Sequence, residues 1–216
     1  MASIEPGKFR RLLLSALTLT GFALLGAALV AYTESRTRDQ IAENIRRQVL
    51  DSLYALVPRN RHDNDLLKAD INVQDEELLG VAKPVTAYIA TQNNQPVAVL
   101  IRSVAPNGYS GPIELLVGIW WNGTLAGVQV VTHRETPGLG DLIDSDKSDW
   151  LLGFNNRSLQ DPGLERWAVK RDGGDFDQFT GATVTPRAVI KAVKNTLVYF
   201  EANKTAMFAA YQTRQE

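Results

Sequence analysis

The sequence predicts an α+β fold, in which one N-terminal transmembrane helix precedes a single domain with a mixed or antiparallel sheet and flanking helices. Three observations support this prediction. An uncharged apolar run lies near the N-terminus, strand-like runs separated by turn signals fill the middle of the chain, and helical spacing returns near its end. The length of 216 residues suits one domain of ordinary size plus an extra element.

The composition narrows the chemistry that the chain can support. The formal net charge is -1, so no nucleic-acid partner is expected. Cysteine is absent, which excludes disulfides, thiolate zinc sites and cysteine-held iron–sulfur clusters. With only His62 and His133, one chain cannot build a multi-histidine metal centre. A redox role would therefore need an organic cofactor.

The uncharged apolar run covers residues 12–32. At about 1.5 Å per residue, it is just long enough to cross the roughly 30 Å of bilayer hydrocarbon. A cleaved signal peptide is the alternative, but the apolar region of such a peptide usually has only about 7–15 residues. We therefore predict an uncleaved transmembrane helix.

Basic residues on both sides of this run predict its orientation. They are Lys8, Arg10 and Arg11 before it, and Arg36 and Arg38 after it. The excess before the run is modest, but long domains translocate largely regardless of charge. We expect residues 1–11 to form a cytoplasmic tail and the domain to lie across the membrane.

Residues 33–58 are predicted to form an amphipathic helix that continues out of the membrane and ends at Pro58. Its apolar stripe consists of Ile41, Ile45, Val49, Leu53 and Leu56. The stripe could pack on the domain or on another subunit. Residues 59–80 are polar and acidic without the spacing of a calcium loop, so we expect a solvated connector.

The domain is expected to cover residues 81–203 and to begin with strands. The predicted strands are Pro84–Ala90, Pro96–Ile101, Ile113–Trp121, Thr124–Thr132 and Arg166–Lys170. A longer loop joins the first two, and Asn122-Gly123 is a strong hairpin signal between the next two. Their apolar composition suggests a sheet covered by helices. Gly118 indicates a bulge or a close backbone approach.

A C-terminal helix is predicted from Pro186 to about Asn203. Apolar residues recur there at helical spacing, namely Val189, Ile190, Val193, Leu197 and Phe200. Pro186 suits the first helical position, and Thr183 or Thr185 can act as the N-cap. We expect residues 204–216 to be helical but frayed.

The start of this helix is also a candidate phosphate site. A helix N-terminus offers free N–H groups and a partial positive charge. Gly181 and Ala182 add little bulk, so a large group could approach the backbone. The alternative is that the threonines only cap the helix, and the residues alone leave both interpretations open.

The run D-x-x-T-G-A-T, from Asp177 to Thr183, resembles the site at which a flavin transferase joins FMN to a threonine through a phosphoester. The resemblance implies that Thr183 carries covalent FMN. It also implies that Asp177, Thr180, Gly181 and Ala182 form the frame that the transferase recognises. We count Thr185 with these cofactor-binding residues.

Two upstream runs make the resemblance more specific. G-Y-S-G-P-I begins at Gly108, and E-T-P-G-L-G-D begins at Glu135. In this order, the three runs resemble the FMN-binding domain found in two related proteins. These are the G subunit of the Rnf (also called Rsx) ion-translocating oxidoreductase and the C subunit of the sodium-translocating NADH:quinone reductase. The run from Gly138 to Trp150 is more similar to the Rnf protein.

The resemblance implies that the loop from Glu135 to Gly140 lines the flavin ring. Its backbone N–H groups and the side chains of Thr136 and Leu139 would contact the ring, with Gly138 in the turn between them. His133 and Glu135 could instead form an acid–base or metal pair, although two ligands make a poor metal site.

The resemblance implies a membrane-anchored flavoprotein that relays electrons within an ion-translocating complex and is not catalytic alone. Its expected partners are the other membrane and peripheral subunits and the flavin transferase. Its expected location is the bacterial inner membrane, with a cytoplasmic N-terminus and a periplasmic flavin domain. The alternatives are a component of the sodium-translocating reductase, an extracytoplasmic regulatory protein, or an adaptor that never receives flavin.

Overall fold

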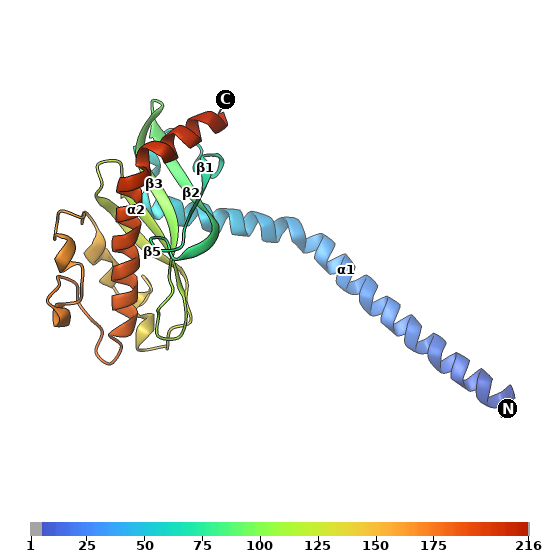
Figure 1. Ribbon diagram of the computed structural model, residues 1–216. Helices are drawn as coiled ribbons and strands as arrows, with labels where there is room; N and C mark the ends of the chain where they lie inside the picture. The colour runs from blue at the N-terminus through green and yellow to red at the C-terminus, as the bar shows by residue number, and fades with distance from the viewer. Residues whose placement is uncertain (1–5, 216) are drawn as a thin grey trace. The chain divides into compact units, whose positions relative to one another are not determined.

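The computed structural model describes residues 6–215, and the chain divides into two units, residues 1–49 and 50–216. The helices and strands are α1 (Pro6–Leu56), β1 (Asp70–Asp75), β2 (Val81–Gln92), β3 (Gln95–Ala105), β4 (Ile113–Trp120), β5 (Leu125–Thr132) and α2 (Val184–Gln215) (Figure 1). Short 3-10 turns are η1 (Arg59–Arg61), η2 (Leu66–Lys68), η3 (Gly140–Ile143), η4 (Trp150–Phe154), η5 (Leu164–Arg166) and η6 (Lys170–Asp172).

Helix α1 joins the predicted transmembrane run and the predicted amphipathic helix into one continuous element. Part of the expected cytoplasmic tail lies outside the described residues, and α1 already includes the tail from Pro6 onward. The helix ends at Leu56, two residues before Pro58, as the rigid φ of proline predicts. Residues 10–56 include a stretch long and apolar enough to cross a membrane.

The domain contains a five-stranded sheet in the order β1-β2-β3-β4-β5, and each neighbouring pair of strands is antiparallel. The predicted α+β fold is therefore confirmed, with the antiparallel form of the sheet. The β2–β3 turn is shorter than expected, because Asn93 and Asn94 both adopt positive φ and close a two-residue hairpin. The hairpin at Asn122-Gly123 is present as predicted, with Gly123 at φ 88°.

Three predicted segments need correction. Residues 59–80 are not a solvated connector, because strand β1 lies there and turns Ile71 and Val73 into the core. The strand predicted at Arg166–Lys170 is replaced by the turns η5 and η6 with a single bridge at Val169. The C-terminal tail is not frayed, because α2 continues to Gln215.

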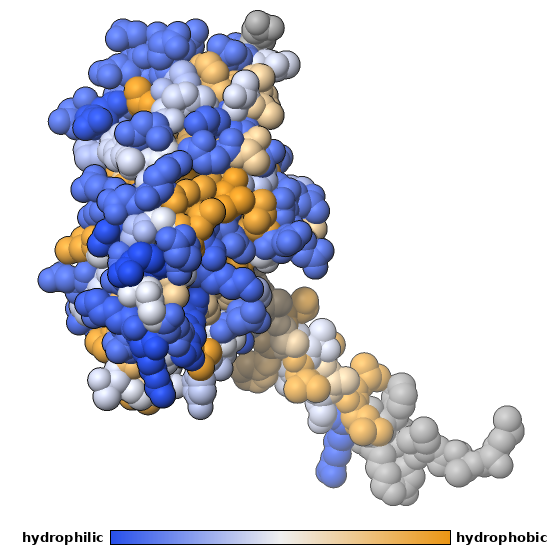
Figure 2. Space-filling view, turned by 60° about the vertical axis from the view of Figure 1, so that its left-hand side comes forward, coloured by the Kyte–Doolittle hydropathy of each residue, from blue (hydrophilic) through white to orange (hydrophobic). Residues whose placement is uncertain are grey.

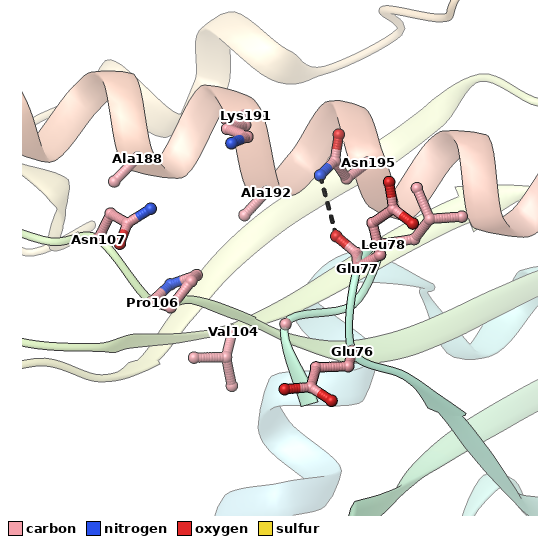
Figure 3. A pocket seen from close by; sticks show the side chains of 11 residues that line it. Glu76, Glu77, Leu78, Val104, Pro106, Asn107, Ala188, Lys191, Ala192 and Asn195 are labelled. Atoms are coloured by element: carbon pink, nitrogen blue, oxygen red, sulfur yellow. Dashed lines mark hydrogen bonds between the residues drawn. The ribbon is translucent and has the colours of Figure 1, made fainter. Parts of the chain in front are cut away.

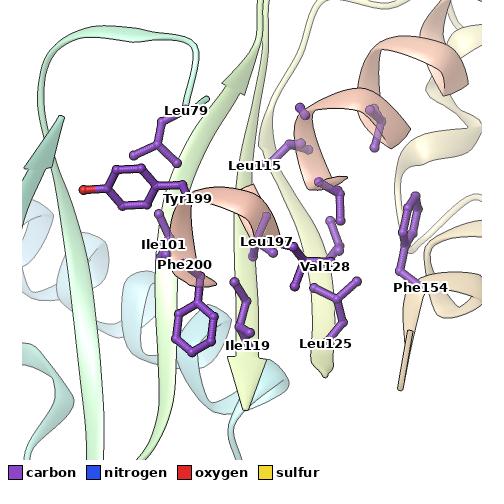
Figure 4. Packing of buried hydrophobic residues seen from close by; sticks show 14 of the residues in the cluster. Leu79, Ile101, Leu115, Ile119, Leu125, Val128, Phe154, Leu197, Tyr199 and Phe200 are labelled. Carbon is purple, nitrogen blue, oxygen red and sulfur yellow. The ribbon is translucent and has the colours of Figure 1, made fainter. Parts of the chain in front are cut away.

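Helix α2 lies across one face of the sheet, and the core fills the space between them (Figures 1 and 4). Buried side chains from α2, such as Leu197 and Phe200, meet Ile101, Leu115 and Ile119 from the central strands. The segment between β5 and α2 joins this core through aromatic contacts, including a stacked pair of Phe154 and Phe176 with ring centroids 4.7 Å apart.

The opposite face of the sheet is covered by the last turn of α1, which belongs to the domain unit. Leu53 and Leu56 are buried there. A Cβ atom at Gly118 would lie 3.1 Å from Cβ of Leu56, and one at Gly127 would lie 2.9 Å from its Cδ2. Gly118 thus permits the predicted close approach, and the β4–β5 register also shifts next to it.

Candidate functional site

Thr183 directly precedes α2 and occupies the position of its N-cap. Pro186 is the third residue of the helix rather than the first, so the predicted start was two residues late. Among the hydrogen bonds of residues 6–215, none involves the Thr183 hydroxyl group, and Pro186 has no N–H for it to accept. Thr183 therefore presents a half-buried, unbonded hydroxyl at the helix start.

Thr185 does not cap the helix, because its side chain turns inward. It is fully buried, and its hydroxyl donates to Oε2 of Glu135 at 2.5 Å. Glu135 is 5% exposed, and its Oε1 accepts a hydrogen bond from the backbone N–H of Ser110 at 3.0 Å. One buried carboxylate thus joins the turn around Ser110, the loop after β5 and the start of α2.

Two glycines pack directly against this carboxylate. A Cβ atom at Gly108 would lie 2.9 Å from Oε1 of Glu135, and one at Gly140 would lie 2.6 Å from Oε2. The latter would also lie 3.0 Å from the Thr185 hydroxyl oxygen. Because real Cβ atoms do not approach other atoms so closely, both positions require glycine for this arrangement.

His133 fixes the backbone of the same loop. Its Nδ1 accepts a hydrogen bond from the backbone N–H of Glu135 at 3.0 Å, and its Nε2 lies 3.0 Å from Oδ2 of Asp144. Because Nδ1 is an acceptor, the ring proton is assigned to Nε2, which donates to the carboxylate. Both nitrogens are therefore engaged, and the side chain of Glu135 points elsewhere. This contradicts the acid–base or metal pair, and residues 6–215 contain no cluster of three or more potential metal ligands.

Residues 136–139 of the loop are exposed. Pro137-Gly138 forms a type II turn, with Gly138 at φ 78° and the N–H of Leu139 donating to the carbonyl of Thr136. The side chain of Leu139 reaches the T-G-A-T segment, where its Cδ2 lies 3.7 Å from the position of a Cβ at Gly181. The two motifs that were predicted to share a site are therefore neighbours in space.

Large apolar side chains are exposed on each of the three segments that Glu135 joins. Tyr109 is 72% exposed, Leu139 44% and Val184 43%. Apolar groups at the surface are common singly. Figure 2 shows a largely hydrophilic surface of the domain, with hydrophobic groups in a central patch and at scattered points. These three apolar side chains lie on segments that the Glu135 carboxylate brings together.

Ion pairs hold the loop that leads to Thr183. Asp177 is exposed and lies 2.6 Å from Nζ of Lys170, and its carbonyl accepts from Nε1 of Trp150 at 2.8 Å. Asp172 accepts two hydrogen bonds from Arg187, at 2.6 and 2.7 Å, which lower the pKa of its carboxyl group. Hydrogen bonding from Arg166 likewise lowers the pKa of Asp175.

A separate pocket lies further along α2, between the β1–β2 turn and the end of β3 (Figure 3). Ala188, Lys191 and Asn195 line it from the helix, and Nδ2 of Asn195 donates to the carbonyl of Glu77 at 3.4 Å. Its volume is about 90 Å³. Pockets for drug-sized ligands measure roughly 300–1,000 Å³, so this one is too small to enclose a flavin ring.

Two family models match the chain, the FMN-binding domain over residues 108–198 and the RnfG N-terminal region over residues 8–56. A protein from Shewanella amazonensis, named as the G subunit of an ion-translocating oxidoreductase complex, is 47% identical over 89% of this chain and 89% of its own. Proteins of the same name from Pseudoalteromonas atlantica and Pseudomonas aeruginosa are 50% and 48% identical, over 90% and 93% of this chain and 90% and 94% of their own. The chain belongs to the RnfG family.

The matched regions of this RnfG-family chain correspond to distinct parts of its structure. The FMN-binding domain match contains all three segments joined by Glu135, whereas β1, β2 and β3 lie before it. The RnfG N-terminal match covers α1 almost entirely. A crystal structure of Shewanella oneidensis NqrC is 20% identical, with a TM-score of 0.46 over 72% of this chain and 73% of its own.

Some contacts of the site had no signal in the sequence. Ser110 takes part through its backbone N–H, so its side-chain type reveals nothing. The pairing of Lys170 with Asp177 depends on a loop that has no regular spacing. Glu135 and Thr185 were predicted as cofactor-binding residues, and the structure brings their side chains to each other.

Proposed function

We propose that this chain is a membrane-anchored flavoprotein that carries FMN on Thr183 through a phosphoester and passes electrons within an Rnf-type ion-translocating complex. The observation that carries the proposal is the Thr183 hydroxyl. It is unbonded among residues 6–215, lies at the start of the 32-residue helix α2 and belongs to an FMN-binding domain.

The chemistry of the T-G-A-T segment fits a phosphoester. A phosphodiester keeps one negative charge, which the free N–H groups and partial positive charge of the α2 N-terminus stabilise. Gly181 adopts φ 81° and carries no side chain, which leaves room beside Thr183. Ala182 contributes only a methyl group.

Attachment needs an activated donor, because esterifying a hydroxyl group by transfer consumes a phosphoanhydride. FAD supplies FMN in such a bond. The Thr183 oxygen forms the new bond to phosphorus, the bond from phosphorus to AMP breaks, AMP leaves and the hydroxyl proton is released. Asp177 and Thr180 are exposed, so a flavin transferase can reach these two residues of the motif that it would recognise.

The loop from Thr136 to Leu139 would hold the flavin ring. Its residues are exposed next to the T-G-A-T segment, and Leu139 supplies an apolar contact. The N–H groups of Gly138 and Leu139 donate within the loop, to Oδ1 of Asp141 and to the carbonyl of Thr136, so contacts to the ring would come from side chains rather than from these N–H groups. A flavin tied by one phosphoester does not exchange, which suits electron relay between neighbouring centres rather than turnover of a soluble substrate.

The proposed setting is the inner membrane of a bacterium, with the N-terminus in the cytoplasm and the flavin domain in the periplasm. The partners are the other membrane and peripheral subunits of the complex. Support comes from the apolar stretch within α1 and from relatives that are named as subunits of an ion-translocating oxidoreductase complex.

Attachment is tested with the full chain purified from a host that supplies a flavin transferase. The denatured band of the wild type should fluoresce, and its intact mass should exceed that of the polypeptide by one esterified FMN. Thr183→Ala should lose both signals. Thr213→Ala, a change of the same kind near the other end of α2, should keep them. Fluorescence of the denatured Thr183→Ala band would refute the assignment.

A further inference from the structure

We propose that Glu135 is a positioning residue that holds Thr183 in the geometry needed for flavin attachment and acts through Thr185. The proposal deepens the function proposed above and rests on attachment at Thr183. In this role, Glu135 holds the polypeptide segments of the site in place and does not contact the flavin.

The burial of Glu135 is the first argument. A carboxylate that is only 5% exposed is costly unless hydrogen bonds compensate it. Both of its oxygens accept hydrogen bonds, one from the backbone of Ser110 and the other from the hydroxyl of Thr185. An apolar side chain of similar size would avoid the cost of burial, but it could not join these segments.

The connection to Thr183 is the second argument. Thr185 lies two residues after Thr183 in the first turn of α2, where the N–H of Arg187 donates to the carbonyl of Thr183 at 3.3 Å. Backbone geometry within a helical turn is nearly rigid, so a fixed Thr185 also fixes the direction in which the Thr183 side chain leaves the helix. No hydrogen bond joins Thr183 to Glu135 among residues 6–215, which makes the effect indirect.

The rigidity of the carboxylate is the third argument. Gly108 and Gly140 pack on its two oxygens, and its own backbone N–H is bonded to His133, which Asp144 holds in turn. A side chain that is constrained from several sides can hold the residue that it contacts in a fixed position, whereas a mobile side chain cannot. Misplacement of a reacting group by about 1 Å can cost about 100-fold in rate.

The test measures the rate at which full-length protein gains FMN from FAD and purified flavin transferase, followed by intact mass. Thr185→Val removes only the donor to Glu135, and Glu135→Ala removes the carboxylate. Both should slow attachment at least about tenfold at a temperature where each variant is folded by circular dichroism. Glu135→Gln should recover most of the rate, because an amide can accept from Ser110 and donate to the Thr185 oxygen.

Thr196→Val is the matched control. Thr196 is also fully buried on α2, but its hydroxyl donates within the helix, to the carbonyl of Ala192. Thr196→Val should leave the rate of attachment unchanged. If Glu135 acts through Thr185, the Glu135→Ala/Thr185→Val double variant should be no slower than the slower single variant, because effects through one contact do not add.

The outcomes separate this inference from the proposed function. If the wild type gains no FMN, the attachment proposal itself fails. If the wild type gains FMN and Thr185→Val and Glu135→Ala load as fast as Thr196→Val, attachment stands and the positioning role is overturned. Additive slowing in the double variant would also overturn the route through Thr185.

Discussion

Thr183 and Thr185 have the same side chain and lie in the same turn, yet their hydroxyl groups have different surroundings. Thr185 is buried and donates to Glu135, whereas Thr183 is half-buried and makes no side-chain hydrogen bond within residues 6–215. A half-buried hydroxyl without a hydrogen-bond partner can be reached by a transferase more easily than a fully buried, bonded one. This difference in local environment supports the proposed attachment at Thr183 rather than at Thr185.

At the same scale, Leu139→Ala tests the proposed contact with the flavin ring. Attachment depends on other residues, so the denatured band should still fluoresce. Loss of about 1 kcal/mol of contact felt in one redox state only corresponds to a shift of the one-electron midpoint potential of about 40 mV. Redox titration measures the shift, and Leu152→Ala, an exposed leucine on η4, is the control. Identical midpoints for all three proteins would show that Leu139 does not contact the ring.

At the scale of elements, regular patterns in the sequence were sufficient to predict β2 to β5 and α2. Strand β1 was missed because only Ile71 and Val73 point inward, and acidic residues surround them. Its polar residues are compatible with an edge strand, where one side faces solvent. The α2 tail was expected to fray because a terminal helix needs tertiary contacts, and the structure supplies them through the buried Met207 and Tyr211.

The candidate site could likewise be predicted only in part from the sequence. The motifs around Glu135 and Thr183 were predicted to meet, and they do. The hydrogen bonds of Glu135 that connect them were not predicted. Their donors, the Thr185 hydroxyl and the Ser110 backbone N–H, lie 50 and 25 residues from Glu135 in the sequence, so these bonds follow no local pattern. Contacts of this kind depend on tertiary geometry, which sequence spacing does not determine.

The loop between η6 and α2 permits a prediction about pH. Hydrogen bonding from Arg187 lowers the pKa of Asp172 from its ordinary value of 3.8. The folded state thus binds the proton less readily than the unfolded state. The stabilisation contributed by this pair is therefore complete above pH 3.8 and is lost as pH falls through the lower folded pKa.

Carboxyl chemical shifts followed by NMR across this range measure the effect. In Arg187→Gln, the titration midpoint of Asp172 should rise toward 3.8. Asp175 is the internal control, because its pKa is lowered mainly by Arg166, and its midpoint should stay in place. Equal movement of both midpoints would mean that a general change of the loop, rather than the Asp172–Arg187 pair, sets these values.

At the scale of the whole molecule, the helix that contains the apolar run and the domain share residues. Helix α1 is continuous from Pro6 to Leu56, but its last turn belongs to the domain unit and is buried in it through Leu53 and Leu56. The helix that carries the apolar run therefore ends as part of the domain core. The C-terminal end of the predicted apolar stripe therefore packs on the domain, where it covers the face of the sheet opposite α2.

The orientation of the whole chain is the last prediction, and it follows from charge. Three basic residues precede the apolar run and two follow it closely, which favours a cytoplasmic N-terminus. A reporter active only outside the cytoplasm should be active after Glu216 and inactive after Arg11. Neutralising Lys8, Arg10 and Arg11 to glutamine should invert part of the population, because the remaining positive charge then lies after the run.

Neutralising Arg36 and Arg38 is the matched control, and it should leave the reporter after Glu216 fully active because it strengthens the original bias. The transferase must share a compartment with Thr183, so any inverted fraction should also lack flavin wherever the transferase is exported. Full activity of a cytoplasm-only reporter after Glu216 in the wild type would contradict the orientation. It would place flavin attachment in the cytoplasm and leave the assignment of Thr183 unchanged.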